Sequence, residues 1–352
     1  LRTSTGMKKG HKYMVMVRAQ VTSDSTTNGE GVKCRLYNAG NAEAVSETEF
    51  IINPQRTDDY QLYAMTLIID SPSDSGAFSD LELQIAGEAA GIEGKCIYAS
   101  LAILDISELV EGVDYVYKFD TTRTDNTASF VTQASVNVEV LDGNQASGDW
   151  LFFVNARFDV GNTNNQKGPQ LQFTGGTSSE AVITEAESTG DTLSMQIVSY
   201  QDISDTSSGS DTTHTFNLQT KDTAAGLPAN AYLSGMIFGM RLDSLRKSAQ
   251  NDSQTAITTT ATVMTDGVAA TLPSITAGTT QDYLVVGYHR FIPASTGRSS
   301  RARIKFTDDS GSSYPVDSAG STNTINTSHD GQDELPTSVS YTHLRAHETV
   351  LD

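Results

Sequence analysis

The sequence is poor in cysteine, tryptophan and proline, and it has no long apolar run. It contains two cysteines, one tryptophan and eight prolines. Cys34 and Cys96 cannot form the multiple-disulfide framework of a small secreted domain, although one bridge between them is conceivable. No apolar run approaches the roughly 20 residues that a membrane-spanning helix requires, so we expect no membrane insertion.

Positive charge is also scarce. The 352 residues include 23 Lys and Arg against 43 Asp and Glu, for a formal net charge of -20. A nucleic acid partner is therefore not expected, because phosphate recognition requires clustered basic side chains. Hydrophobic residues make up 37% and glycine adds another 28 residues, which indicates a folded chain. Ser, Thr, Asn, Asp and Gly fill the remainder, as is typical of short strands joined by polar turns.

An internal repeat is the strongest feature that is present. Three segments, YMVMVRAQV from Tyr13, WLFFVNARF from Trp150 and YLVVGYHRF from Tyr283, begin with a large aromatic residue and then alternate. Tyr13 and Trp150 are 137 residues apart, and Trp150 and Tyr283 are 133 apart. Because side chains alternate across a strand, the pattern predicts three equivalent strands, each with one buried face.

A second strand recurs at the same offsets. KCRLYN, QLQFTG and RIKFTD align Cys34 with Leu171 and Ile304. Further matches join repeats one and two: YAMTLIID with LSMQIVSY, LELQI with FNLQT, and Leu104-Asp105 with Leu242-Asp243. The alternating runs FVTQASVNVEV and AITTTATVMTDGVAATL are expected to open repeats two and three.

These repeats predict an all-β protein of tandem antiparallel β-sandwich, jelly-roll-like domains. We place repeat one at residues 1–112, repeat two at 113–248 and repeat three at 249–338. Each full repeat is about 135 residues long, enough to bury its own core. Repeat one is expected to lack its opening strand and repeat three its second half, as in a window cut from a longer protein.

Residues 339–352 form a probable tail that is not a domain. His343 and His347 have helical i, i+4 spacing beside Glu348, but zinc proteases place Glu directly after the first His, where Leu344 stands. The segment Val339–Thr349, VSYTHLRAHET, instead resembles one translated frame of a transposon-type sequencing adapter, with all eleven residues matching. We therefore assign no function to His343 or His347.

The other candidate ligands favour structural roles. His11, His214, His289 and His329 are scattered, and His289 aligns with inward positions. Acidic loops at Asp202–Asp211 and Thr307–Ser313 could hold calcium, but turns use the same residue types and neither loop has EF-hand spacing. Cys34 aligns with core positions, which predicts a buried free thiol. We therefore predict no catalytic residue, no metal site and no cofactor, with calcium kept as an open alternative.

No motif identifies an enzyme. G-x-S-x-G and phosphate-loop signatures are absent. Carboxylate pairs for glycoside cleavage would be set by the fold, and no pair stands out. Trp150 occupies the position that defines the repeat, which favours a structural role, while Tyr60 and Tyr63 could face solvent and stack on a sugar.

The strand DYLVVGYHRF and the segment ANAYLSGMIFGMRLDSL resemble repeats in virion structural proteins of tailed phages, such as tail fibres, appendages or capsid decorations. Repeat one departs from that pattern, with LAILDI where Arg-Leu-Asp is expected. The resemblance implies a non-enzymatic, oligomeric component of an extracellular particle, a virion, that associates with itself or with other virion proteins. A secreted bacterial adhesin or carbohydrate-binding protein, with a host surface glycan as partner, is the alternative.

Overall fold

The computed structural model describes the chain in segments. These are residues 2–3, 7–8, 10–24, 31–45, 48–52, 61–70, 80–125, 127–140, 148–159, 167–174, 192–203, 212–222, 231–244, 280–291, 298–302, 305–307, 313–315, 325–329 and 335–347. Within them the only helical element is one 3-10 turn, η1 (Leu242–Ser244), and the remaining elements are strands in antiparallel ladders. The prediction of an all-β antiparallel sandwich fold is confirmed.

The first repeat forms two sheets. Its strands are β1 (Arg2–Thr3), β2 (Lys12–Ser23), β3 (Val32–Asn38), β4 (Glu43–Ala44), β5 (Phe50–Ile52), β6 (Gln61–Asp70), β7 (Leu81–Gly87) and β8 (Gly94–Asp105). The first inner sheet has the order β6-β2-β8, and the first outer sheet contains β1, β7, β3, β4 and β5. The side chains between these two sheets form one apolar core, with Val15 and Val17 from β2 facing Leu36 from β3.

The second repeat also forms two sheets. Its strands are β9 (Tyr115–Asp120), β10 (Thr124–Asp125), β11 (Val131–Val140), β12 (Gly148–Asp159), β13 (Lys167–Phe173), β14 (Thr192–Ile203), β15 (Thr212–Asp222) and β16 (Ala231–Arg241). The second inner sheet contains β14, β12, β16, β9 and β10, and the second outer sheet has the order β11-β15-β13. Their shared core includes Trp150, Phe152 and Phe216.

Tyr13 and Trp150 occupy equivalent places, as the repeat predicts. Each lies on a central inner strand and points into the core of its own sandwich, with exposed fractions of 6% and 0%. Tyr283 lies in strand β17 (Thr280–Phe291), as expected, and the surroundings of its side chain are outside the described residues. The predicted opening strand FVTQASVNVEV is confirmed as β11, whereas residues 256–272 lie outside the described residues.

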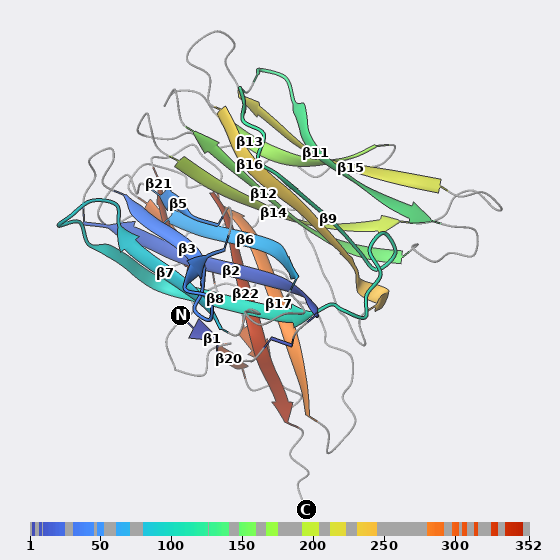
Figure 1. Cartoon of the computed structure of the whole chain (residues 1–352), viewed down its shortest axis with the longest axis horizontal. Coiled ribbons are helices and arrows are strands. Elements are labelled where there is room, and N and C mark those ends of the chain that lie inside the picture. Colours follow the sequence, from blue (N-terminus) through green and yellow to red (C-terminus); the bar gives the residue numbers. More distant parts are fainter. Residues whose placement is uncertain are drawn as a thin grey trace, which may run out of the picture.

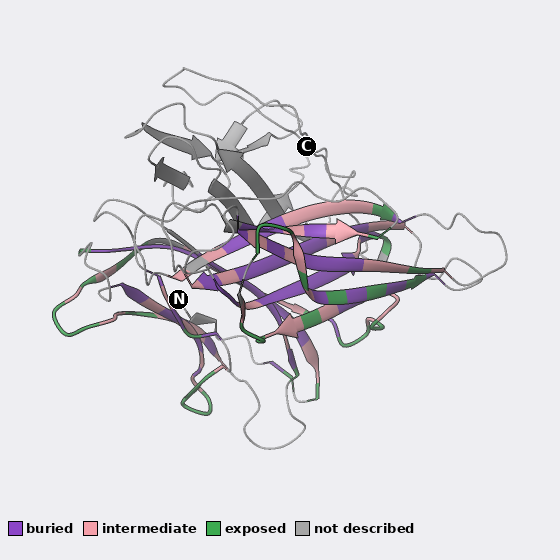
Figure 2. Cartoon of the chain, turned by 90° about the horizontal axis from the view of Figure 1, so that it is seen from above, coloured by how far each residue is buried: buried purple, intermediate pink, exposed green. Residues whose placement is uncertain are grey.

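The four sheets stack as consecutive layers. Figure 1 shows the first outer sheet, the first inner sheet, the second inner sheet and the second outer sheet in that order. Figure 2 shows buried residues along the strands and exposed ones in the turns and at strand ends. The cluster between the two inner sheets is buried as well. The two inner sheets are therefore covered on both faces.

The ladders correct three matches between the repeats by two residues. Tyr13 pairs with Asp105 and Trp150 pairs with Arg241, so Asp105 corresponds to Arg241 and not to Asp243. In the neighbouring sheets, Leu36 of β3 pairs with Leu83, and the aligned Phe173 of β13 pairs with Phe216. Leu83 therefore corresponds to Phe216. The alignment of the β6 segment with the β14 segment also has to be moved by two residues. A two-residue shift leaves every side chain on its own face, so an alternating pattern cannot reveal it.

Residues 280–347 form three two-stranded ladders. β17 pairs with β22 (Leu335–His347), β18 (Arg298–Ala302) with β21 (Ile325–His329), and β19 (Lys305–Thr307) with β20 (Ser313–Pro315). His343 and His347 thus lie on a strand, and the helical spacing considered for a metal site does not occur. The adapter origin of Val339–Thr349 and the domain boundaries stay predictions.

Replacing Phe216 by alanine tests the layered core. Its ring lies 4.2 Å from that of Phe152 and 4.7 Å from that of Phe173, measured between centroids. We expect F216A to lower the free energy of unfolding by about 3–5 kcal/mol, since it removes a fully buried ring. Urea titration followed by Trp150 fluorescence measures the change. A loss below about 1 kcal/mol would contradict the packing between the second inner and outer sheets.

Candidate functional site

The junction between the two sandwiches combines an apolar cluster with a set of buried and partly buried hydrogen bonds. Strands β2 and β12 each have one face that points away from the core of their own sandwich. These two faces pack against each other at the junction. Met14 and Met16 from β2 pack in one cluster with Phe153 from β12 and Met236 and Phe238 from β16. Every side chain of β2 after Lys12 is therefore buried, although only alternate ones point into the first core.

A chain of hydrogen bonds also crosses this interface. Arg18 Nε donates to Gln196 Oε1 at 2.9 Å, and Gln196 Nε2 donates to Asn155 Oδ1 at 3.2 Å. Asn155 Nδ2 then donates to the carbonyl oxygen of Ala64 at 3.0 Å. The exposed fractions of Arg18 and Gln196 are both 0%. Since a buried polar group without a partner is costly, these bonds fix one relative position of the two inner sheets.

Ring contacts flank the same interface. The Arg18 guanidinium lies 5.9 Å from the centroid of the Phe153 ring, and that of Arg157 lies 5.1 Å from the Phe50 ring. A small, partly open pocket beside Asn155 and Arg157 has room for about one water molecule. A pocket of this size does not accommodate an organic substrate.

Residues 106–114 connect the two inner sheets, and several hydrogen bonds hold this connection in place. Asp114 accepts a hydrogen bond from the backbone N–H of Val110 at 2.9 Å and one from Arg241 Nη2 at 2.9 Å. The backbone carbonyl of Asp114 also accepts from the Arg241 N–H at 2.8 Å. Gly112 has a φ of 86°, a left-handed conformation that a side chain would strain. The end of this connection at Asp114 is thus held to β16 of repeat two, whereas the N–H of Ile106 at its start donates to the carbonyl oxygen of Lys12 in repeat one.

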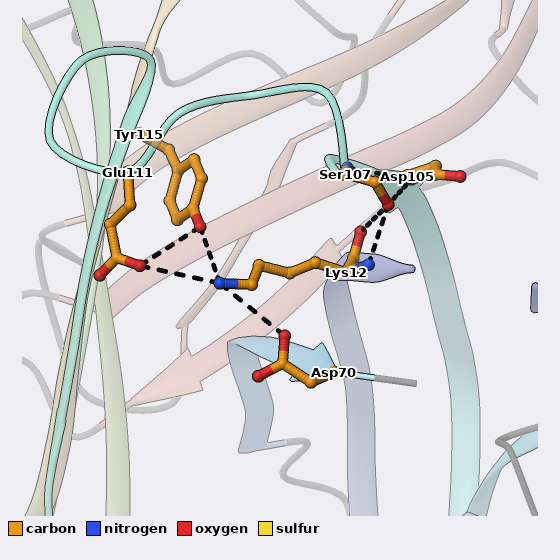
Figure 3. Close-up of polar contacts among 6 residues, drawn as sticks. All are labelled: Lys12, Asp70, Asp105, Ser107, Glu111 and Tyr115. Atoms are coloured by element: carbon orange, nitrogen blue, oxygen red, sulfur yellow. Dashed lines mark hydrogen bonds and ion pairs between the residues drawn. The ribbon is translucent and has the colours of Figure 1, made fainter. Parts of the chain in front are cut away.

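Lys12 lies at the start of β2 and contacts several polar groups of the junction. Figure 3 shows these groups around its extended side chain. Its ammonium donates to the Tyr115 hydroxyl at 3.1 Å and lies 3.7 Å from Glu111 and 3.8 Å from Asp70. The Tyr115 hydroxyl donates to Glu111 Oε2 at 3.4 Å. One cation thus joins the first inner sheet to the connection and to β9.

A second set of bonds closes the other side of Lys12. Its backbone N–H donates to Ser107 Oγ at 2.9 Å, and that hydroxyl donates to Asp105 Oδ1 at 2.5 Å. His11 Nδ1 lies 2.7 Å from Asp105 Oδ2. These contacts anchor the end of β8, where the chain leaves the first sandwich.

The electrostatics keep these groups in their ordinary charge states. The hydrogen bond to Tyr115 raises the pKa of Lys12, against a smaller opposing effect of burial. Burial raises the pKa of Tyr115. Burial works to raise the pKa of Asp105, but the hydrogen bonds from Ser107 and His11 outweigh it, and that pKa is lowered. At neutral pH the arrangement is an ion-paired clamp, since none of these three pKa values moves toward 7.

The structure places Cys34 and Trp150 in cores, as predicted. Cys34 is a free, fully buried thiol whose pKa is raised by burial, so the prediction of a small hydrophobic role is confirmed. Cys96 is exposed and forms no disulfide in the structure. Trp150 is fully buried against Phe152, with ring centroids 6.0 Å apart, which confirms its structural role.

The prediction that Tyr63 faces solvent is wrong. Its exposed fraction is 0%, and its hydroxyl donates to the carbonyl oxygen of Thr48 at 2.8 Å. Tyr63 lies on the core face of β6, where alternation with buried Met65 and Leu67 directs it inward. Tyr60 lies outside the described residues.

His11 and His214, two histidines whose surroundings are described, lie in different parts of the fold. His11 belongs to the junction, and His214 lies in β15 beside the Phe173 ring, 5.5 Å between centroids. The surroundings of His289 and His329, and most of the two acidic loops, lie outside the described residues. Within the described segments, no three His, Cys, Asp or Glu side chains are grouped so as to hold a metal ion. In the same segments we find no helix with the length and apolarity needed to cross a bilayer.

Sequence reasoning missed the junction. Lys12, Asp70 and Tyr115 are far apart in the chain and belong to no motif. The apolar part did leave a signal, because YMVMV and WLFFV are continuous apolar runs, and such runs are typical of strands buried on both faces.

Comparisons with known proteins identify no family. No protein-family model matches the chain, and no curated protein matches it. The VP2 subviral particle of infectious bursal disease virus aligns at 12% identity and a TM-score of 0.27, covering 65% of this chain and 56% of that one. The STIV major capsid protein aligns at 11% identity and a TM-score of 0.23, covering 70% and 94%. Dimeric latent PorU from Porphyromonas gingivalis aligns at 9% identity and a TM-score of 0.23, covering 98% and 34%.

The chain therefore spans little more than half the length of the VP2 structures that it matches. These TM-scores are too low for the similarities to carry an argument about this chain. Its architecture and contacts have to support any functional conclusion.

Removing the central amide of the interface tests the hydrogen-bond chain. N155A removes the hydrogen bond to the Ala64 carbonyl and the one from the Gln196 amide, and we expect the free energy of unfolding to fall by about 1–3 kcal/mol. N137A is the matched control, because Asn137 is exposed on β11 and only accepts from Thr215 at 3.0 Å. The control is expected to change stability by less than about 0.5 kcal/mol. Equal effects in urea unfolding would contradict the role of Asn155.

The lowered pKa of Asp105 predicts a pH-dependent contribution to stability. Asp105 stabilises the fold above its unfolded pKa of about 3.9, and the contribution is lost as the pH falls through its lower pKa in the folded state. D105N should therefore be less stable than the wild type at pH 7, and the difference should shrink toward about pH 2. Urea midpoints across this pH range measure the effect.

Glu108 supplies the control for this measurement. Its carboxylate is exposed in the same connection. E108Q removes an exposed carboxylate, and its urea midpoint at pH 7 should stay close to that of the wild type. A D105N difference that is independent of pH would show that the ionised carboxylate has no part in the clamp.

Proposed function

We propose that this chain is a non-enzymatic structural subunit of an extracellular particle, and more specifically a fibre, appendage or decoration component of a tailed-phage virion. The observation that carries the proposal is the burial of both faces of both inner sheets. Two sandwiches that share an interface of this kind form one stiff body and not two independently moving modules. A stiff, repeated body suits a component whose task is to hold shape.

The polar groups of the stack support the same role. The Lys12 clamp and the Asp114–Arg241 pair, at 2.9 Å, hold the connection in place. The outer sheets carry polar networks: Arg35 pairs with Glu49 at 3.1 Å on one of them, and Asn217 donates to Gln172 at 2.6 Å on the other. The net charge of -20 favours solubility outside the cell.

Sugar recognition by stacking receives less support. Tyr63 is buried, and every aromatic side chain with a described burial is buried or half-buried. Binding of a sugar by stacking needs an exposed ring. A secreted adhesin that binds its partner by other contacts remains the second candidate function.

The proposal predicts self-association of the purified chain. We expect sedimentation velocity to show oligomers whose share rises with concentration, and negative-stain electron microscopy to show uniform rods, rings or shells. F216A, which loosens the core, should reduce the assembled fraction. A chain that stays monomeric at all concentrations, together with selective binding on a glycan array, would favour the adhesin instead.

A further inference from the structure

The two cysteines of the chain lie on the two facing sheets of the first sandwich. Cys34 belongs to β3 of the first outer sheet, and its side chain is part of the first core. Cys96 belongs to β8 of the first inner sheet and pairs with Val21, whose buried side chain belongs to the same core. Residues directly opposite each other in a ladder share a face of the sheet. Both cysteines therefore lie on faces that border one core, from opposite sides.

The two sheets approach each other closely at the end where β3 and β8 begin. Strand β3 begins at Val32 and β8 begins at Gly94, each two residues before its cysteine. A Cβ atom on Gly94 would lie 3.2 Å from Val32 Cγ1 and 3.3 Å from the carbonyl carbon of Ala86 in β7. The sheets of a sandwich are about 10 Å apart, whereas bridged cysteines have Cα atoms about 4.4–6.8 Å apart. The close approach at this end brings the two strands toward the spacing that a bridge needs.

Repeat two shows that the equivalent positions share one core. Leu171 takes the place of the cysteine in β3, as the sequence repeat predicts. Val21 and Phe158 are also aligned, and each follows directly after a register shift in its ladder. Val21 pairs with Cys96. Because Phe158 pairs with Tyr232, Tyr232 takes the place of Cys96 in β16. Leu171 and Tyr232 both have exposed fractions of 0% and belong to the same apolar cluster.

The two thiols differ in how a reagent in solution reaches them. Cys96 is exposed, whereas Cys34 has an exposed fraction of 0%. Burial raises the pKa of Cys34, and the charge of Cys96 raises it further. Because a Coulomb interaction weakens with distance, this second effect is consistent with the proximity that the strands indicate.

We propose that Cys34 and Cys96 form a disulfide bond between the two sheets of the first sandwich when the chain meets a small disulfide oxidant such as oxidised glutathione. The Cys96 thiolate attacks the oxidant first, which breaks its S–S bond, releases one glutathione thiolate and leaves a mixed disulfide on Cys96. Cys34 then loses its proton to solvent and attacks the Cys96 sulfur, which releases the second glutathione. The two protein thiols lose two electrons and two protons in total, and one oxidised glutathione takes them up as two glutathione thiols.

The bridge would fasten the first sandwich where the second relies on apolar packing alone. It closes a loop that includes strands of both sheets, and such a closure stabilises the fold mainly by restricting the unfolded chain. Disulfides persist in oxidising surroundings outside the cell. That the chain meets an oxidant there rests on the proposed function, whereas formation of the bridge does not.

Oxidation of the full, folded chain by oxidised glutathione at mildly alkaline pH tests the proposal. Remaining thiols are alkylated in urea, and a glutamate-specific protease then cleaves the chain without reduction. Each cysteine lies in its own peptide, residues 31–43 and residues 94–108. We expect mass spectrometry to find these two peptides joined, in protein that runs as a single chain on a non-reducing gel. The oxidised chain should also have a higher urea midpoint than the reduced chain by circular dichroism.

Two variants serve as controls. C96S removes the exposed thiol, so Cys34 should stay reduced, and the urea midpoint should be the same with and without the oxidant. C34V keeps an apolar side chain of similar size in the core, and Cys96 should then retain a glutathione adduct. Circular dichroism confirms that both variants fold.

Each other outcome overturns the proposal. A glutathione adduct on Cys96 beside a reduced Cys34 in the wild type would show that the folded chain does not bring the thiols together. A bridge that joins two chains, or one that forms only in urea, would show the same. Particle assembly by a chain that forms no bridge would leave the proposed function standing and remove this inference alone.

Discussion

The packing of the two inner sheets against each other determines the rest of the structure. A sheet in a two-layer sandwich buries one face and leaves the other to solvent. Here the second face of β2 supplies Met14 and Met16, and that of β12 supplies Leu151 and Phe153. Leaving such side chains in water would cost about 1.5–3 kcal/mol for each large one, so the two repeats have to stack. The tandem order of the repeats and the short connection at residues 106–114 make that stacking local in the chain.

Polar side chains give the interface a single alignment. Apolar contacts are non-directional, and two flat apolar faces tolerate sliding. The hydrogen bonds from Arg18 through Gln196 and Asn155 to the Ala64 carbonyl prevent sliding. A displacement of one residue would break several of these buried hydrogen bonds. The Lys12 clamp acts at the end of the same strand, where water begins to compete and each ion pair contributes less. Buried hydrogen bonds in the middle and ion pairs at the rim are thus complementary.

The sequence alone predicted the strands, their core faces and the repetition, and it failed on register and on the junction. Period-two alternation assigned Val15, Val17 and Phe152 to cores, since it reports directly on which face a residue occupies. It left the pairing uncertain by two residues, as the Leu104-Asp105 match shows, because that slip changes no face. Tyr63 was considered as a solvent-facing ring, but it lies on the core face of β6, as its alternation with Met65 and Leu67 indicates. Lys12, Asp70 and Tyr115 carry no pattern, and only the folded chain brings them together.

The two repeats also show what duplication has preserved. At the position that defines the repeat, Tyr13 keeps a hydroxyl that accepts from the Lys8 N–H at 2.6 Å, whereas Trp150 fills a fully enclosed core. Cys34 and Leu171 share another position with different volume and chemistry, and both are fully buried. What recurs is the burial of these inward-facing positions, although the volume of the side chain differs between the repeats. Divergence of this kind is expected where packing is the constraint, because cores accept apolar replacements when volume and pattern are kept. At the other aligned inward positions, Val17 and Val154 are identical whereas Val15 and Phe152 differ, and all four side chains are fully buried.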